Sequence, residues 1–396
     1  MNGCIYLDYN ATTPLAPEVV AAMLPYLTEE FGNPSSLHWA GVPARDSVEA
    51  ARSQVAALLC CDATEVVFTS GGTEANNQAL KGVFYACCRD KARPHIITSQ
   101  IEHPSILEPC RFLEGLGAEV TYLPVDRLGQ VDPNDVKEAI QEQTVLISVM
   151  HANNETGVIQ PITEISQVAR GCGVLCHTDA AQTVGKLPVD VESLGVDLLT
   201  IAGHKLYGPK GVGALFIREG VGLTSLLHGA GHEAGRRAGT ENVASIAGLG
   251  TACELALRWL DANDVLSLRD YFWQKLRETF GDLVVLNGHP DERLPNTLNV
   301  SFRGFLGSDV LARLAAVAAS TGSACHAGVH SLSPVLAAMG VEESTGLGAV
   351  RFSLGRTTTV SEIDWAIREL ERVISESDRT VGESKAKSAT RKPVAH

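Results

Sequence analysis

The sequence predicts an α/β protein in which a large, mainly parallel sheet is followed by a smaller α+β domain. Through roughly the first two thirds of the chain, short β-rich runs alternate with helix-like stretches; for example, EVVFTS (65–70) leads into EANNQALKGVFYACC (74–88). These runs are apolar along their whole length, which is typical of parallel strands covered by helices on both faces. After about residue 255 this alternation gives way to a different pattern.

The strand–loop–helix order repeats along the first part of the chain, which favours parallel strands joined by right-handed crossovers. Helix-like stretches follow the strands, as in PSILEPCRFLEGLG (104–117) and ITEISQVARGCG (162–173). The further predicted strands are PHIITSQ (94–100), TVLISVM (144–150), VLCHTDA (174–180), DLLTIAG (197–203) and GALFIRE (213–219).

The last part of the chain mixes isolated strands with helices, which indicates a smaller α+β domain. A long charged helix (265–281) comes first, and a last helix is expected at 361–376. The strand-like runs between them are NTLNVSF (296–302) and AVRFSLG (349–355). Residues 377–396 are polar without periodicity, so we expect a disordered tail there.

Bulk properties narrow the class of protein. A net charge of −14 argues against a general binder of nucleic acid or anionic membranes, whose phosphate contacts need a basic surface. The ten cysteines form no C-x-x-C pair, which favours free thiols in a reducing compartment. The first residues lack the pattern of a signal peptide, and we expect no transmembrane helix. The cytoplasm is the expected location.

The stretch FTSGGTEANN (68–77) predicts an anion site. A strand ends, two glycines allow a tight turn, and Thr73 and Glu74 open a helix. Backbone N–H groups at a helix start bind anions, here with a hydroxyl beside them. By itself the stretch favours a plain helix cap at Thr73 that binds nothing.

Polar side chains follow several neighbouring strands of the predicted sheet. Asp179 ends one strand, His103 follows another in SQIEHPS, and Asn154 lies in HANNETG after a third. Taken singly, Asp179 could cap a helix, and His103 or Asn154 could simply form a turn. Because ligands of open α/β sheets bind at the carboxyl ends of the strands, the joint pattern favours one shared crevice.

Lys205 follows the apolar strand LLTIA in GHKLYGPKG. A lysine beside an apolar run is usually a strand end that meets solvent. Here an anion cup, a carboxylate for a ring nitrogen and a lysine together suggest pyridoxal 5′-phosphate, which needs all three. Desolvation and nearby positive charge would lower the pKa of Lys205 and favour its free amine.

The set of motifs closely resembles the cysteine desulfurases, which have the class V aminotransferase fold, and the neighbouring selenocysteine lyases. The matching stretches run in order over roughly residues 4–375: YLDYNATTPLAPEV, FTSGGTEANN, EHPSIL, HANNETG, HTDAAQTVGKLPVDV, GHKLYGPKGVGAL, RRAGTEN, STGSACHAG and VRFSLGRTTT. The resemblance implies fold type I of the pyridoxal-phosphate enzymes, with a seven-stranded sheet. It implies a large domain at 14–255 and a small domain made of 1–13 and 256–376.

The resemblance also assigns roles by position. Lys205 would carry the cofactor as a Schiff base, Asp179 would hold the pyridine nitrogen, and Gln182 the phenolic oxygen. His103 would stack over the ring and shuttle protons. Asn154, which would also contact the cofactor, and Arg351 would bind the substrate carboxylate. The residues implied for the phosphate are Gly72, Thr73 and His204, together with Thr240, which would reach the phosphate of the other subunit in a homodimer.

Cys325 would be the nucleophile that takes the sulfur. It lies in ASTGSACHAGVHSLSPV, where glycines and serines leave a loop poorly restrained, so we expect the loop to be mobile. Only a thiolate attacks, and His326 and His330 could support it. The implied reaction converts L-cysteine to L-alanine and leaves a persulfide on Cys325. The sulfur would then pass to an acceptor protein such as an iron–sulfur scaffold.

Other interpretations remain open at this stage. The family often has Ser or Thr before GHK, whereas this chain has Ala202 in IAGHK, so a hydroxyl contact to the phosphate would be missing. That feature resembles selenocysteine lyases, which release selenium from L-selenocysteine. A thiol hydrolase built on Cys325 would leave Lys205 and Asp179 without a role. A non-catalytic scaffold would be expected to lose Lys205 or Cys325. No metal site is expected.

Overall fold

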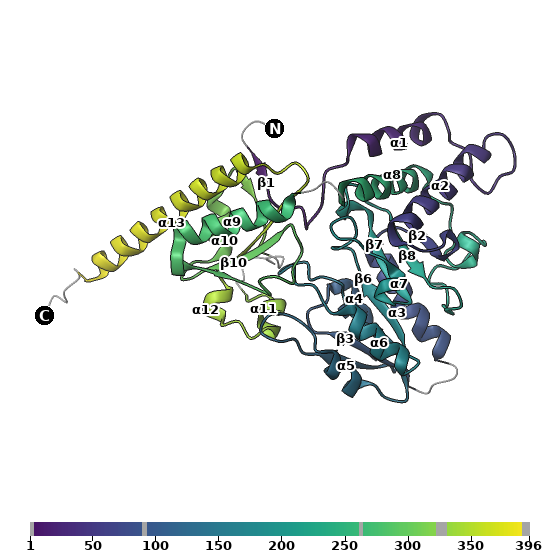
Figure 1. Ribbon diagram of the computed structural model, residues 1–396, viewed down its shortest axis with the longest axis horizontal. Helices are drawn as coiled ribbons and strands as arrows, with labels where there is room; N and C mark the ends of the chain where they lie inside the picture. Colours follow the sequence, from purple (N-terminus) through teal and green to yellow (C-terminus); the bar gives the residue numbers. More distant parts are fainter. Residues whose placement is uncertain (1–3, 89–92, 261–263, 322–330, 390–396) are drawn as a thin grey trace, which may run out of the picture.

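The computed structural model describes residues 4–88, 93–260, 264–321 and 331–389 of the 396-residue chain. Its largest sheet has seven strands in the order β2-β8-β7-β6-β5-β3-β4 (Figure 1). All neighbours from β7 through β6, β5 and β3 to β4 are parallel, which confirms the mainly parallel sheet. The bounds are β2 Val66–Thr69, β3 His95–Ser99, β4 Glu119–Leu123, β5 Thr144–Ser148, β6 Leu175–Asp179, β7 Leu198–Ala202 and β8 Gly213–Ile217.

Strand β8 departs from the parallel arrangement, because it runs antiparallel to both β2 and β7. Only residues 203–212 join β7 to β8. A parallel return needs a crossover of a dozen or more residues, so this short connection folds back beside β7. The connection includes His204 and Lys205, which therefore remain at the carboxyl end of β7.

The two faces of the large sheet are covered by different helices. Neighbouring strand residues point to opposite faces, so Val67 packs in one hydrophobic cluster and Phe68 in the other. Helices α3 and α4 cover the first face, and α2, α6 and α8 belong to the cluster on the second. The helices of this part are α1 Pro17–Thr28, α2 Val42–Leu59, α3 Gly72–Cys87, α4 Pro104–Glu114, α5 Pro133–Ala139, α6 Ile162–Gly171, α7 Val191–Leu194 and α8 Val243–Leu260.

A second, smaller unit surrounds an antiparallel sheet in the order β12-β10-β9 (Figure 1). Ile5 and Leu7 are part of its hydrophobic core, and β1 pairs in parallel with β11. The N-terminal residues are therefore packed against the C-terminal part of the chain. The bounds are β1 Ile5–Tyr6, β9 Val284–Leu286, β10 Thr297–Phe302, β11 Val317–Ala318, β12 Ala349–Ser353, α9 Val265–Phe280, α10 Gly307–Arg313, α11 Pro334–Ala338, α12 Glu343–Gly346 and α13 Val360–Ala389.

Helices α8 and α13 can be compared with two expectations from the sequence, the absence of a transmembrane helix and a disordered C-terminal tail. Within the part of the chain that the structure describes, α8 is long and apolar enough to cross a membrane, but it packs in the core with α1 and α2. It is therefore explained as a core helix. Helix α13 continues to Ala389, which differs from the disordered tail expected from residue 377. The sequence of this stretch has no proline before Pro393 and includes good helix formers such as Glu, Lys and Ala.

Candidate active site

The carboxyl ends of β3, β5, β6 and β7 meet at one cavity of about 380 Å³. Its lining combines these strand ends with the start of α3 and with one residue of β12. Nine of the residues predicted from the sequence line it: Gly72, Thr73, His103, Asn154, Asp179, Gln182, His204, Lys205 and Arg351. The convergence follows from the parallel sheet, since all four of these strands end at the same edge.

Lys205 ends a short 3-10 helix, Gly203–Lys205, which directly follows β7. Its Nζ donates hydrogen bonds to the backbone carbonyls of Asn10 (2.5 Å) and Ala11 (2.9 Å). Burial lowers the pKa of Lys205 to about 8, helped by repulsion from Arg351 and opposed by attraction to Asp179. About a fifth of the amine is therefore neutral near pH 7.4, against about a thousandth for an ordinary lysine, and the neutral form is the one that acts as a nucleophile or base.

Asp179 is the last residue of β6 and is buried, with an exposed fraction of 8%. One carboxylate oxygen accepts from Asn76 Nδ2 at 2.7 Å, and the other accepts from the backbone N–H of Ala181 at 2.9 Å. Asn76 lies on α3 and also donates to Ser105 Oγ at 2.8 Å. The carboxylate is thus held in the cavity wall by one hydrogen bond from α3 and one from the turn that follows β6.

His103 is the N-cap of α4, where its Nδ1 accepts from the backbone N–H of Ser105 at 3.1 Å. That bond leaves Nε2 as the ring nitrogen that carries the proton in the neutral form. Desolvation by the surrounding protein lowers the pKa of His103, as does the positive charge of Lys205, while Asp179 opposes the shift. The imidazole lining the cavity is therefore neutral at physiological pH.

The start of α3 forms the predicted anion cup. Gly71, at φ +145°, makes the turn that a residue with a side chain rarely adopts, and Gly72 and Thr73 then open the helix. A Cβ at Gly72 would lie 3.3 Å from the Cβ of Ala202, so the two residues approach closely. Ala202 lines the cavity without a hydroxyl.

His204 lines the same hollow as Gly72 and Thr73. Its Nδ1 lies 3.2 Å from Thr12 Oγ1. Burial, together with repulsion from Lys205 and Lys210, lowers the pKa of His204 to about 4. Lys210 also lines the adjoining hollow beside Ser70 and Gly71, which the sequence reasoning did not identify. The neutral imidazole and this ammonium group add to the helix N-terminus as groups that favour an anion.

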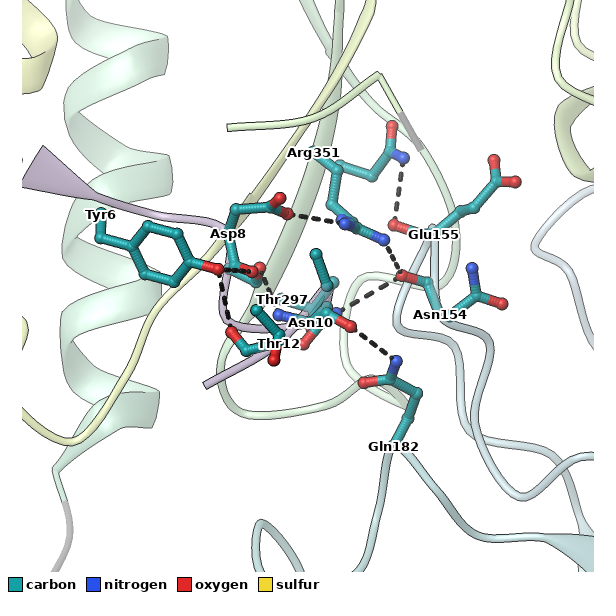
Figure 2. Close-up of polar contacts among 12 residues, drawn as sticks. Tyr6, Asp8, Asn10, Thr12, Asn154, Glu155, Gln182, Thr297 and Arg351 are labelled. Carbon is teal, nitrogen blue, oxygen red and sulfur yellow. Dashed lines mark hydrogen bonds and ion pairs between the residues drawn. The ribbon is translucent and has the colours of Figure 1, made fainter. Parts of the chain in front are cut away.

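Arg351 reaches the cavity from β12 of the smaller unit (Figure 2). Its Nη2 donates to Asp8 Oδ1 at 2.7 Å, and its Nη1 donates to the backbone carbonyl of Asn154 at 2.8 Å. Both terminal nitrogens of the guanidinium are therefore oriented by protein oxygens, and its side chain is buried. Asp8 lies in a stretch that the sequence analysis quoted but to which it assigned no role.

Gln182 and Lys186 follow β6 and face the N-terminal segment (Figure 2 shows Gln182 and Asn10). Gln182 Nε2 donates to the backbone carbonyl of Asn10 at 3.0 Å, and Gln182 Oε1 accepts from Lys186 Nζ at 2.8 Å. Asn10 and Lys186 were not predicted as site residues. A buried lysine in HTDAAQTVGKLPVDV was the signal available for Lys186, but its burial becomes visible only in the fold.

Thr240 lies apart from this cavity. It lines a separate hollow with Phe68, Gly211 and Arg237. The loop before it is held by Glu233, whose carboxylate accepts two bonds from Arg52 at 2.7 and 2.9 Å. Thr240 is therefore not brought together with the other predicted residues within one subunit. Cys325, the predicted sulfur-accepting nucleophile, lies outside the described residues.

Comparison with known proteins identifies the family. Residues 5–365 match the family described as "Aminotransferase class-V". The chain belongs to the class-V aminotransferase family. It is 50% identical over 381 residues to "Cysteine desulfurase IscS" of Dictyoglomus turgidum, covering 95% of this chain and 96% of the relative. The same name belongs to a Methanosarcina thermophila relative that is 47% identical over 377 residues, covering 94% and 92%.

Solved structures lead to the same family. A structure titled "NIFS-LIKE PROTEIN" matches with a TM-score of 0.87 at 36% identity, covering 94% of this chain and 99% of the other. A structure titled "SspA in complex with cysteine" matches with a TM-score of 0.80 at 36% identity, covering 90% and 100%. These likenesses confirm the fold predicted from the sequence.

The cofactor of this family is pyridoxal 5′-phosphate, and the residues present fit it. Lys205 supplies an amine whose pKa is lowered to about 8, and Asp179 supplies a fixed carboxylate in the same cavity. Gly72, Thr73 and His204 offer N–H and hydroxyl groups for a phosphate on the far wall. The donor set thus contains a group for each of the three chemical features of the cofactor.

Proposed function

We propose that this chain is a pyridoxal-phosphate-dependent cysteine desulfurase, a sulfurtransferase that converts L-cysteine to L-alanine. The carrying observation is the single cavity that joins the Lys205 amine, the Asp179 carboxylate and the Arg351 guanidinium. The names of the relatives favour L-cysteine as the substrate over L-selenocysteine. When bound, the cofactor supplies an aldehyde for the substrate amine and a ring that withdraws electrons from the substrate Cα.

Side chains of the protein bind the substrate and transfer protons. Lys205 Nζ takes the proton from the substrate Cα, because its lowered pKa leaves it free to act as a base. Asp179 would hold the ring nitrogen of the cofactor in its protonated form through a charge-assisted hydrogen bond. Arg351 binds the substrate carboxylate, and Asn154 lies beside it. His103 exchanges protons through Nε2, while Gln182 donates to the phenolic oxygen.

Sulfur transfer is completed by Cys325. The Cys325 thiolate attacks the substrate sulfur, so that an S–S bond forms while the substrate C–S bond breaks. The electron pair of the C–S bond stays with carbon, which is protonated and leaves as alanine. Sulfur is oxidised and carbon reduced in the same step, so no external oxidant is required. The persulfide on Cys325 then passes its outer sulfur to an acceptor protein, such as an iron–sulfur scaffold.

A homodimer is part of the proposal. Thr240 does not line the cavity of its own subunit, which fits a role at the phosphate of a second copy. Exposed apolar side chains gather on α1 and in the connection to α2, where a second copy would cover them. These are Leu24, Leu27, Phe31, Leu37 and Trp39, with exposed fractions of 55–85%.

The cytoplasm is the proposed location. The cysteines of the described residues are free thiols, among them the adjacent pair Cys60 and Cys61. Free thiols are typical of a reducing compartment.

The net charge of −14 supports a protein that does not act on nucleic acid or on anionic membranes.

The test is a product assay on the purified protein loaded with pyridoxal 5′-phosphate. Incubation with L-cysteine is expected to yield alanine and, in the absence of an acceptor, one extra sulfur on Cys325 detected by mass spectrometry of peptides. Cys325→Ser is the matched control, which should keep the cofactor and lose the added sulfur. A protein that forms neither alanine nor the sulfur adduct would refute the proposal.

A further inference from the structure

Lys186 is a buried lysine that the mechanism does not use. Its exposed fraction is 8%, and it does not line the active-site cavity. Among the described residues no carboxylate lies within ion-pair distance of its Nζ; the only acceptors recorded are Asn10 Oδ1 at 2.9 Å and Gln182 Oε1 at 2.8 Å. A lysine held by two amide oxygens, with no acid, is costly to bury. Its hydrogen bonds therefore need an explanation.

The backbone is shaped to bring this side chain inward. Gly185 has φ +78°, and a Cβ there would lie 3.1 Å from the Cβ of Leu206. The backbone N–H of Lys186 donates to Thr183, which closes the turn after β6. Because only glycine fits this conformation and this close approach easily, the turn fixes where Lys186 points.

The bond from Lys186 fixes the orientation of the Gln182 amide. An amide can rotate so that its oxygen and nitrogen exchange places, and the hydrogen-bond partners decide between the two positions. The backbone carbonyl of Asn10 can only accept and faces Nε2, while Lys186 Nζ donates to Oε1, so the two partners together hold the amide in this orientation. Gln182 lines the cavity, so the second N–H of its Nε2 remains for a ligand there.

Asn10 is held by the same lysine, and its other polar side-chain and carbonyl groups also have partners. Figure 2 shows its contact with Gln182. Its Oδ1 accepts from Lys186 and from Asn296 at 3.1 Å, and its Nδ2 donates to Thr297 at 2.8 Å. Its backbone carbonyl accepts from both Gln182 and Lys205. Lys186 therefore donates a hydrogen bond both to Gln182 and to Asn10, the residue that accepts from the Gln182 amide.

We propose that Lys186 is a positioning residue for the cofactor, acting through Gln182. The lysine makes no contact with the cavity; it sets which end of the Gln182 amide is presented to the phenolic oxygen of pyridoxal 5′-phosphate. The inference rests on the proposed function, because it needs that cofactor in this cavity.

The test is a double-mutant cycle on the affinity of the apo-protein for pyridoxal 5′-phosphate, measured by absorbance titration. We expect Lys186→Met and Gln182→Ala each to raise Kd about tenfold, the usual effect of losing one well-placed hydrogen bond. If Lys186 acts through Gln182, the double variant should bind no more weakly than Gln182→Ala alone. Lys137→Met, an exposed lysine in the last turn of α5, is the matched control and should leave Kd unchanged.

Urea unfolding of each apo-protein separates positioning from a merely structural role. Additive effects of the two substitutions on Kd would overturn the inference, as would a Lys186→Met protein with lowered stability and unchanged Kd. Lys186→Gln keeps an N–H donor on a chain one atom shorter, and its Kd should lie between those of the wild type and Lys186→Met. It also provides the comparison if Lys186→Met does not fold. Wild-type protein that binds no cofactor would refute the proposed function itself.

Discussion

The unusual pKa of Lys205 has a consequence for stability that can be measured without the reaction. Burial lowers this pKa from its ordinary value of 10.5 to about 8, so the unfolded chain binds a proton more tightly than the folded apo-protein does. Stability therefore rises with pH between about 8 and 10.5; below that window the cost of burying the charged amine is fully present and does not change with pH. The two pKa values correspond to about 3 kcal/mol, or about 2 kcal/mol after allowance for partial exposure of the side chain.

Lys205→Met removes the titrating group while keeping a chain of similar length. The assay is urea unfolding of wild-type and variant apo-proteins at pH 7, 8, 9 and 10. We expect the wild type to gain about 2 kcal/mol relative to the variant across this range. Lys186, whose pKa is lowered by burial and by repulsion from Lys205, is present in both proteins, so the difference between them reports Lys205 together with its coupling to Lys186.

The pH slope is more informative than the stability at any one pH. The variant also loses the two bonds from Lys205, at about 0.5–1.5 kcal/mol each, although the carbonyl of Asn10 keeps its bond from Gln182 and Ala11 is exposed to water. That cost is independent of pH and shifts the two curves by a constant. Parallel curves of stability against pH for the two proteins would refute the claim that burial lowers the pKa of Lys205.

Three further changes test other parts of the site. Arg351→Lys should raise KM for L-cysteine about 10- to 100-fold with a smaller change in kcat, because an ammonium group cannot bind a carboxylate bidentately; steady-state kinetics would contradict this if kcat alone fell. Cys325→Ser should keep the cofactor absorbance and form no sulfur adduct, and an adduct elsewhere by peptide mass spectrometry would exclude Cys325 as the acceptor. Glu233→Gln should cost about 1–3 kcal/mol of unfolding free energy, because Arg52 loses its buried carboxylate partner and keeps only the exposed Glu49 as an ionic partner; a loss under 1 kcal/mol would show that the buried pair is not needed.

Much of the site could be predicted because its residues lie where single strands end. Asp179, His103 and Lys205 each follow an apolar run that can only be a buried strand, and a parallel sheet brings such ends to one edge. The turn at Gly71 and Gly72 is similarly local, since the glycine conformations and the helix start are written in adjacent residues. Local patterns of this kind do not depend on knowing which distant segments meet.

The parts that could not be predicted depend on contacts between distant segments. The Asp8–Arg351 ion pair and the bonds from Lys186 to Asn10 join residues more than 170 positions apart. No periodicity in either segment indicates the partner. The antiparallel course of β8 was missed for a related reason, because an apolar strand reads the same in both directions.

The N-terminal segment connects the two units at the cavity. Ile5 and Leu7 anchor it in the core of the smaller unit, whereas Asn10 accepts hydrogen bonds from Lys205 and Gln182 of the larger one. Asp8, between these anchors, orients Arg351. A displacement of this one segment would therefore move both the Lys205 amine and the Arg351 guanidinium. The spacing between these two groups across the cavity thus depends on the contacts that the N-terminal segment makes with both units.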